Sequence, residues 1–386
     1  MSTVHLDRAE PLDVVVLGLG AVGAAALWAL SNRGLSVLGL DPHPPCHSLG
    51  SSHGQTRVFR HAYFEHPDYV PILRNATGTF ERWEADADTS LLHRAGVLVM
   101  GPEGCPAVEG SRQAARLHGL EIRDLDGAAL CKEYPQFAKH PTLDAVFEAD
   151  AGFVRVERSI STALQLATAP RLHGVGVSQW ERHGADRITL RLTNGRSLTT
   201  RRLAVAAGAW TAALVPSLAP LLTVTRQVQA WVTPAQPELA EASCLPCWLW
   251  DRPGDRHFYG IPADPERPGP PLAKVAVHGS DGVVAPDAVN RMVSTADLDP
   301  IKHGLATHVP GLLGPIRDAS VCLYTSSPDE HFIVDRLPEA PEVSVVCGLS
   351  GHGFKLAPAL GQILSDLSVE GRTDLPVDFL GLRRFG

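Results

Sequence analysis

Long apolar runs are absent from this sequence, and none reaches the roughly 18 consecutive residues that a membrane-spanning helix requires. The first residues, MSTVHLDRAEPLD, are polar and contain no apolar secretory segment. Basic residues are outnumbered, since 34 Lys and Arg face 42 Asp and Glu, which gives a net charge of -8. Nucleic acids and anionic membranes bind basic surfaces, so we expect neither as a partner and predict a cytoplasmic protein.

Cysteine is also scarce. The seven cysteines are an odd number and are scattered, which argues against a disulfide framework. Cys244 and Cys247 have the spacing CxxC, which suits a redox pair or half of a zinc site. No second CxxC and no pair of histidines at zinc-ligand spacing follows, so we interpret this pair as coincidental and predict no metal site.

What the sequence does contain is a strand–helix–strand unit close to its start. Val14–Leu17 is a short, wholly apolar run, as expected of a strand buried on both faces. Ala21–Leu30 is rich in helix-forming residues, and Val37–Leu40 is a second apolar run. This order predicts a βαβ unit in a parallel sheet.

The glycines between the first strand and the helix have the spacing GxGxxG. Gly18 permits a tight turn, Gly20 lets a pyrophosphate approach the backbone, and Gly23 lets the helix pack closely on the strand. The helix N-terminus then supplies free N–H groups to the phosphates. Asp41, which ends the second strand, is placed to accept from a ribose hydroxyl and disfavours NADP. The pattern predicts dinucleotide binding but does not choose between FAD and NAD.

The rest of the chain gives coarser signals. The segment 52–63, SHGQTRVFRHAY, is too rich in His and Arg for an element of the core. Asn194 and Gly195 predict a hairpin turn. Alternating stretches between residues 222 and 316 predict an antiparallel sheet, and the residues after GHGFK predict an amphipathic helix.

Seven motifs together give the chain a family likeness. They are GLGAVG, SSHGQTRVFRHAY, GVLVMGP, AAGAWT, AKVAVH, VCLYTSSPDEHFIVD and GLSGHGFKLAP. With these motifs the chain resembles the flavin-dependent amine oxidases of the monomeric sarcosine oxidase and N-methyltryptophan oxidase type, within the larger D-amino-acid-oxidase-like group. The resemblance covers nearly the whole chain and implies FAD rather than NAD.

The resemblance also implies roles for single residues. Cys322 matches the cysteine that bonds covalently to the flavin, and His53 and Arg57 match residues beside the flavin ring. Lys274 matches the lysine that promotes the reaction with oxygen, and His278 matches a histidine beside the substrate. The residues implied to bind substrate are Arg60, Lys355, Tyr259 and Tyr324, and those implied to bind the cofactor are also Ser52, Thr56, Gly351, Gly353, Phe354 and Lys355.

The residue types suit this chemistry. A substrate carboxylate in a partly dry pocket needs a planar, bidentate cation and a second charge, which Arg60 and Lys355 supply. A fixed ammonium such as that of Lys274 stabilises the negative charge that oxygen gains during reduction. Without the resemblance, Lys274 reads as a solvated strand residue and Cys322 as an inert buried thiol.

The expected fold is α/β, with a Rossmann-like FAD domain and an antiparallel-sheet substrate domain. We expect the FAD domain to comprise residues 1–86, 145–222 and 318–386, and the substrate domain residues 87–144 and 223–317. The expected reaction oxidises a secondary or N-methyl amino acid to an imine and reduces O2 to H2O2, in a monomer. Leu249 and Trp250 fall where the pocket wall is expected, and they leave the substrate side chain open.

Three alternatives remain. The first is a flavin dehydrogenase that passes electrons to a quinone or an electron-transfer protein and needs no oxygen-activating lysine. The second is a flavin-binding subunit without amine turnover, against which the complete set of Arg60, Lys274, Cys322 and Lys355 argues. A nicotinamide-dependent dehydrogenase is third, disfavoured by the segment GLSGHGFK.

Overall fold

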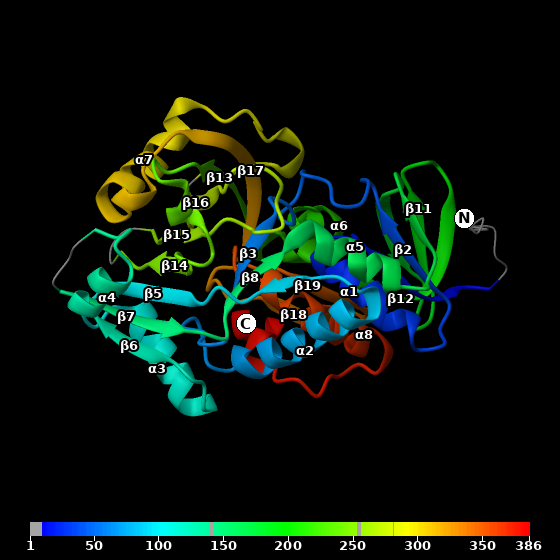
Figure 1. Cartoon of the computed structure of the whole chain (residues 1–386). Coiled ribbons are helices and arrows are strands. Elements are labelled where there is room, and N and C mark those ends of the chain that lie inside the picture. Colours follow the sequence, from blue (N-terminus) through cyan, green and yellow to red (C-terminus); the bar gives the residue numbers. More distant parts are fainter. Residues whose placement is uncertain (1–9, 139–141, 253–255, 281) are drawn as a thin grey trace.

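The computed structural model describes residues 10–138, 142–252, 256–280 and 282–386. Its strands form two eight-stranded sheets and one three-stranded sheet. Figure 1 shows the two large sheets in separate lobes, with both described ends of the chain in the lobe of the first sheet. No helix of the described residues is long and apolar enough to cross a membrane.

The first sheet is built around parallel strands. Its centre consists of β1 (Leu12–Leu17), β2 (Val37–Asp41), β12 (Ser197–Val205) and β19 (Ala340–Cys347), which pair in parallel. Its flanks are β9 (Arg171–His173), β10 (Val177–Arg182), β11 (Ile188–Leu192) and β18 (Ile333–Leu337). The hairpin predicted at Gly195 joins β11 to β12, and Gly195 has the positive φ of +81° that such a turn requires.

Helices cover one face of this sheet. They are α1 (Ala21–Ser31), α2 (Tyr69–Ala87), α5 (Val156–Leu166) and α8 (Ala357–Val369). Helix α1 packs against α5 and α8, and its residues from 22 to 30 are all buried. A helix enclosed in this way is apolar around its whole circumference, which explains its run of Ala and Leu. The predicted βαβ unit is therefore confirmed.

The second sheet is mainly antiparallel. In spatial order it contains β17 (Ile316–Ser326), β13 (Thr223–Val232), β16 (Ala273–Val277), β15 (Phe258–Ile261), β14 (Cys247–Trp250), β5 (Val97–Pro102), β7 (Leu143–Glu148) and β6 (Arg123–Asp126). Only β14 and β5 pair in parallel among these neighbours of the described sheet. Short helices α3 (Pro106–His118) and α4 (Gly127–Glu133) lie with it, and α6 (Thr211–Leu214) follows β12. The two large sheets confirm the predicted fold class.

The expectation that segment 52–63 is too polar for a core element is wrong. Its residues 56–59 form β3 (Thr56–Phe59), which pairs with β8 (Gly152–Arg155) and, through it, with β4 (Leu92–His93). Arg60 and His61 follow it and are only 4% and 7% exposed. Buried charges need partners, and acidic side chains from outside the segment supply them.

One helix lies where only strands were predicted. Helix α7 (Thr295–His308) begins in a capping box, in which Ser294 accepts from the backbone of Asp297 and Asp297 from that of Ser294. Its Ile301 and Leu305 pack into the core beneath the second sheet. The division into domains stays a prediction, and its boundaries at 145 and 318 fall inside β7 and β17.

Candidate active site

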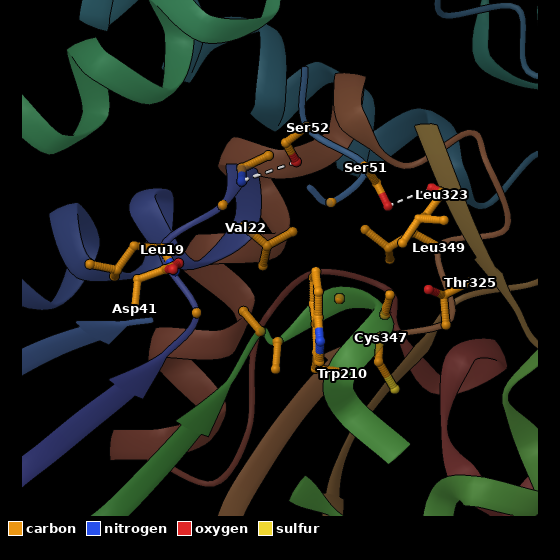
Figure 2. Close-up of a pocket in the computed structure, with 18 of the residues that line it drawn as sticks. Leu19, Val22, Asp41, Ser51, Ser52, Trp210, Leu323, Thr325, Cys347 and Leu349 are labelled. Carbon is orange, nitrogen blue, oxygen red and sulfur yellow. Dashed lines mark hydrogen bonds between the residues drawn. The ribbon is translucent and has the colours of Figure 1, made fainter. Parts of the chain in front are cut away.

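The larger of two adjoining cavities, of about 420 Å³, lies at the carboxyl ends of the parallel strands. The segments that follow β1, β2, β12 and β19 all contribute to its lining, as is usual for ligand sites in such sheets. Figure 2 shows Asp41, Trp210 and Cys347 around it, each from a different strand end.

The glycine turn is shaped for close packing. Gly18 has a φ of +84°, and a Cβ there would lie 2.5 Å from the carbonyl oxygen of Ala206. A Cβ on Gly23 would collide with the carbonyl oxygen of Gly18, so helix α1 could not approach the strand. The helix has no side-chain cap and no acidic residue in its first turn. The N-terminus of α1 therefore suits an anion in the cavity.

The carboxylate of Asp41 fixes the glycine turn and can still accept further hydrogen bonds. Its carboxylate accepts from Leu19 N at 2.7 Å and from His43 N at 2.8 Å. Because a carboxylate can accept about four hydrogen bonds, it can still accept from a ribose hydroxyl. On the other side of the turn, Ser52 Oγ lies 3.4 Å from Ala21 N, a contact drawn in Figure 2.

The rest of this cavity fits a large, partly apolar ligand such as FAD. Leu19, Val22, Leu323 and Leu349 line it, and Figure 2 shows them around the central space. The hydroxyl of Thr325, also in the lining, is buried without a partner among the described residues. A buried hydroxyl left unpaired in the protein is suited to a ligand hydrogen bond.

The second cavity, of about 270 Å³, shares part of its wall with the first. The shared residues are Arg57, Tyr324, Ser350, Gly351 and Phe354. A Cβ on Gly351 would collide with the Tyr324 ring, so only glycine permits this close approach. The second cavity therefore adjoins the first across a shared wall.

Arg60 in the second cavity is already paired. Its Nη2 donates to both carboxylate oxygens of Glu65 at 2.7 Å, and its guanidinium stacks 4.3 Å from the Tyr63 ring and 4.2 Å from the Phe64 ring. Burial alone would raise the pKa of Glu65, but the charge of Arg60 holds this pKa at about 2. The guanidinium of Arg60 is therefore already occupied by Glu65, a residue that the sequence analysis did not single out.

Lys355 lies beside this pair. Its Nζ donates to the carbonyl oxygen of His352 at 2.8 Å and lies 3.5 Å from the hydroxyl of Tyr63. Burial, followed by the charge of Arg60, lowers the pKa of Lys355 to about 7. The two cations expected to bind a carboxylate thus line one cavity, and one of them titrates near neutral pH.

Lys274 does not line the wall that the two cavities share but lies behind it. It is 1% exposed, and its Nζ donates to the carbonyl oxygens of Gly54 and Thr56 at 2.9 and 2.8 Å. Burial, followed by the charge of Arg57, lowers its pKa well below the usual value. His53 is also buried nearby, its Nε2 lacks a partner among the described residues, and burial lowers its pKa to about 3.

Cys322 is held against Arg57. Its Sγ lies 3.5 Å from Arg57 Nη2 and 3.5 Å from the carbonyl oxygen of Ser51. Arg57 also donates to the carbonyl oxygens of Ser51 and Thr56, both at 2.9 Å. Arg57 lines both cavities, so it connects the buried thiol with the shared wall.

His278 completes the inner wall of the second cavity. Its Nδ1 lies 3.3 Å from the hydroxyl of Tyr324, and its ring centroid is 6.3 Å from that of Tyr259. Burial lowers the pKa of His278 to about 3 and raises the pKa of both tyrosines. These three side chains are therefore neutral at physiological pH.

The predicted site residues divide into three groups. Those that line the first cavity are Gly18, Gly20, Asp41, Ser52, Arg57, Tyr324, Gly351, Gly353 and Phe354. Those that line the second are Arg57, Arg60, Tyr259, His278, Tyr324, Gly351, Phe354 and Lys355. Those that line neither are Gly23, His53, Thr56, Lys274 and Cys322. Of the two expected wall residues, Leu249 lines the second cavity, whereas Trp250 packs in the core against Phe137 and His308.

Residues 13–367 match the family described as FAD dependent oxidoreductase. The chain belongs to this family. A monomeric sarcosine oxidase of Streptomyces avermitilis is 34% identical to this oxidoreductase over 383 residues, which cover 96% of this chain and 97% of the relative. An N-methyl-L-tryptophan oxidase of Salmonella arizonae is 32% identical over 378 residues, 97% of this chain and 99% of the relative. These similarities confirm the predicted family likeness and FAD as the family's cofactor.

Two solved structures share the fold of this oxidoreductase. NikD in its open form, an unusual amino acid oxidase essential for nikkomycin biosynthesis, has a TM-score of 0.82 and 21% identity, covering 97% of this chain and 98% of its own. The L-proline dehydrogenase from P. horikoshii has a TM-score of 0.81 and 18% identity, covering 98% of both chains. An oxidase and a dehydrogenase thus share this architecture, so the fold does not decide the electron acceptor.

Proposed function

We propose that this FAD-dependent oxidoreductase is an amine oxidase that converts a secondary or N-methyl amino acid to an imine and reduces O2 to H2O2. The observation that carries the proposal is the second cavity, where Arg60 and Lys355 lie with the neutral His278 beside a wall shared with the dinucleotide cavity. The similarity to a sarcosine oxidase and an N-methyl-L-tryptophan oxidase supports the same reaction.

The residues of the first cavity would hold FAD. The free N–H groups of α1 and the turn from Gly18 to Gly20 suit the pyrophosphate, and Asp41 suits the ribose. When bound, FAD supplies the two-electron oxidation of the amine and the transfer of those electrons to an acceptor. The buried, unpaired hydroxyl of Thr325 and the close approach of Gly351 to the Tyr324 ring suit a ligand that extends from the first cavity to the shared wall.

The second cavity would select and orient the substrate. Arg60 presents a planar fork that matches a carboxylate, and Lys355 adds a second positive charge. Burial of the amine in this cavity disfavours its charged form, so the site would favour the neutral amine over the ammonium form. Only the neutral amine has the electron pair that oxidation requires.

Lys274 distinguishes the oxidase from its main alternative. In the oxidase its ammonium would stabilise the negative charge that oxygen gains. Its lowered pKa is the specific observation that keeps a flavin dehydrogenase as second candidate, since a neutral Lys274 would lose this role. A flavin-binding subunit without turnover is less favoured, because the clamp residues of the cavity are all present.

The test is a visible spectrum of the purified protein followed by peroxide-release assays across N-methyl and cyclic amino acids. We expect a yellow protein that releases H2O2 with at least one secondary amino acid. Reduction of the yellow protein by substrate without peroxide release would instead support the dehydrogenase. A yellow protein that no amine or amino acid reduces would overturn both and support the subunit.

We also propose that the flavin is covalently bound through Cys322. The thiol is 3% exposed and borders the shared wall through its contact with Arg57. Acid-precipitated protein should therefore stay yellow, and a proteolytic peptide containing Cys322 should carry the mass of the flavin. Cys347→Ser is the control, since Cys347 lines the first cavity and its loss should leave the pellet yellow. A colourless pellet with free FAD in the supernatant would contradict the covalent bond but not FAD binding.

The remaining expectations are proposals of the same kind. We propose a cytoplasmic monomer with a small amino acid or amine and O2 as its reaction partners. The division into an FAD domain of residues 1–86, 145–222 and 318–386 and a substrate domain of residues 87–144 and 223–317 is likewise a proposal. The placing of the two cavities at the boundary between the large sheets supports it.

A further inference from the structure

The ammonium of Lys274 is held by one turn of the backbone. Its Nζ donates to the carbonyl oxygens of Gly54 and Thr56 at 2.9 and 2.8 Å, on either side of Gln55. This turn leads into β3, whereas Lys274 comes from β16 of the second sheet. The place of the ammonium therefore depends on the shape of a turn for which the proposed function names no support.

The backbone of this turn is strained at Gln55. Gln55 has a φ of +72°, in the left-handed region that disfavours a residue with a side chain, and Gly54 has a φ of +91°. A Cβ on Gly54 would lie 2.1 Å from Nε2 of Gln229, so the turn is also closely packed. A strained backbone of this kind persists only when contacts from the surrounding structure hold it.

The carboxylate of Glu157 supplies such contacts. Its Oε1 accepts from Gly54 N at 2.7 Å and from Gln55 N at 3.2 Å, and its Oε2 accepts from Gln55 N at 3.0 Å. From the same end of α5, Val156 N donates to the carbonyl oxygen of Gln55 at 2.7 Å. Glu157 lies in the first turn of α5, where the helix dipole favours an ionised carboxylate. The first residues of α5 thus hold both the amide and the carbonyl group of Gln55.

The charge of Glu157 also acts on Lys274. The titratable groups around Lys274 are Arg57, Cys322, Glu157 and His53. Burial, followed by the charge of Arg57, lowers the pKa of Lys274, whereas Cys322 and Glu157 raise it. His53 is neutral at physiological pH because burial lowers its pKa to about 3. A Cys322 bonded to the flavin would have no thiolate, so Glu157 is the one anion left among these four groups.

We propose that Glu157 is a positioning residue for Lys274. Its carboxylate fixes the turn from Gly54 to Thr56, whose carbonyl groups hold the ammonium, and its negative charge stabilises that ammonium beside Arg57. The inference rests on the proposed function only for the role of the ammonium in oxygen reduction. The placing of Lys274 by Glu157 is independent of the electron acceptor.

A direct titration of Lys274 tests the proposal. The sequence has five lysines, so the flavin-loaded protein labelled with ε-13C-lysine gives few NMR signals, and Lys274→Met identifies the signal of Lys274 by its absence. In Glu157→Gln we expect the pKa of Lys274 to fall by about one pH unit, because removal of a nearby anion disfavours the cation. Glu157→Asp keeps the charge and should restore most of this pKa. The control Glu109→Gln removes a carboxylate from the first turn of α3, outside both cavities, and should leave the pKa of Lys274 unchanged.

The oxygen half-reaction supplies a second measurement. The cation exists only below the pKa of Lys274, so the rate of reoxidation should fall as the pH rises through this pKa. In Glu157→Gln this fall should occur about one pH unit lower, and reoxidation within that interval should slow by up to about tenfold. Reduction by substrate without oxygen should keep nearly the unaltered rate. A purely structural role of Glu157 would alter both half-reactions or neither and would not move the pH of the fall.

The outcomes separate this inference from the proposed function. An equal pKa of Lys274 in Glu157→Gln and in the unaltered protein would overturn the positioning by Glu157. If Lys274→Met is reoxidised at the unaltered rate, the oxygen role fails, while a lowered pKa in Glu157→Gln still upholds the positioning. If Glu157→Gln does not fold, Gln55→Gly is combined with it, since glycine adopts a φ of +72° without strain. The pKa of Lys274 is then compared between this double variant and Gln55→Gly alone, with the same two outcomes.

Discussion

Lys274→Met is expected to be reoxidised about 100- to 1000-fold more slowly than the unaltered protein when air is admitted after anaerobic reduction. The Nζ of Lys274 is fixed by the carbonyl oxygens of Gly54 and Thr56 and is buried close to Arg57. That charge arises only when oxygen is reduced, and a group that stabilises one step slows only that step when removed. Reduction by substrate should therefore proceed at nearly the unaltered rate.

Stopped-flow absorbance of the flavin band measures the two half-reactions separately. Lys302→Met is the matched control, because Lys302 is half-exposed on α7, its Nζ lies 3.6 Å from Asp299 Oδ1, and it lines neither cavity. Equal reoxidation of Lys274→Met and the unaltered protein would make Lys274 a structural lysine and favour the dehydrogenase. The effect of the ammonium should also fade as the pH rises through its lowered pKa, since the cation exists only below that pKa.

Arg60→Ala is expected to lose about 2–5 kcal/mol of carboxylate binding, which is about 30- to several-thousand-fold in affinity. Its guanidinium is buried and Nη2 donates to both carboxylate oxygens of Glu65, a charge-assisted contact that is stronger than a hydrogen bond between neutral groups. Preference for an amino acid over its decarboxylated amine should largely disappear, in kcat/KM and in binding alike. Arg94→Ala is the control, since Arg94 is a surface arginine that pairs with Glu81 and Asp150 and lines neither cavity.

Two further measurements test the same clamp. Glu65→Gln removes the internal competitor of Arg60 and should bind carboxylates more tightly. Lys355 has a pKa of about 7, so its cation is present below that pH and is lost as the pH rises through it. Binding of a carboxylate without an amine should weaken above pH 7, and Lys355→Arg should remove this step because arginine stays charged. Unchanged preference in Arg60→Ala together with pH-independent binding would place the clamp elsewhere.

Elements with a strong local signal were predicted from the sequence. The unit of β1, α1 and β2 follows from apolar runs, glycine spacing and helix propensity, all of which act over a few residues. The turn at Gly195 follows from its dipeptide alone. Helix α7 was missed among strands, although Ser294 and Asp297 form a capping box that a search for this spacing would have found.

The candidate site was only partly accessible to sequence reasoning. The glycines, Asp41, Arg60 and Lys355 are recognisable because motifs carry them, and the structure gathers them around two adjoining cavities. The pairing of Arg60 with Glu65 was not predicted, since a carboxylate five residues away in a loop has no periodic signal. Trp250 was expected in the pocket wall but faces the opposite side of β14 from Leu249, because successive strand residues alternate faces.

The sequence by itself determined the dinucleotide fold and the family, and it indicated the residue types of the proposed carboxylate clamp, because each depends on local patterns or on whole-chain similarity. Only the tertiary structure decided which charges are buried, which partners hold them and which side chains face the second cavity. The contact between His257 and Asp251 shows why. The two side chains meet because β14 and β15 are paired in the second sheet, and their properties depend on burial and on the distance between atoms rather than on chain order.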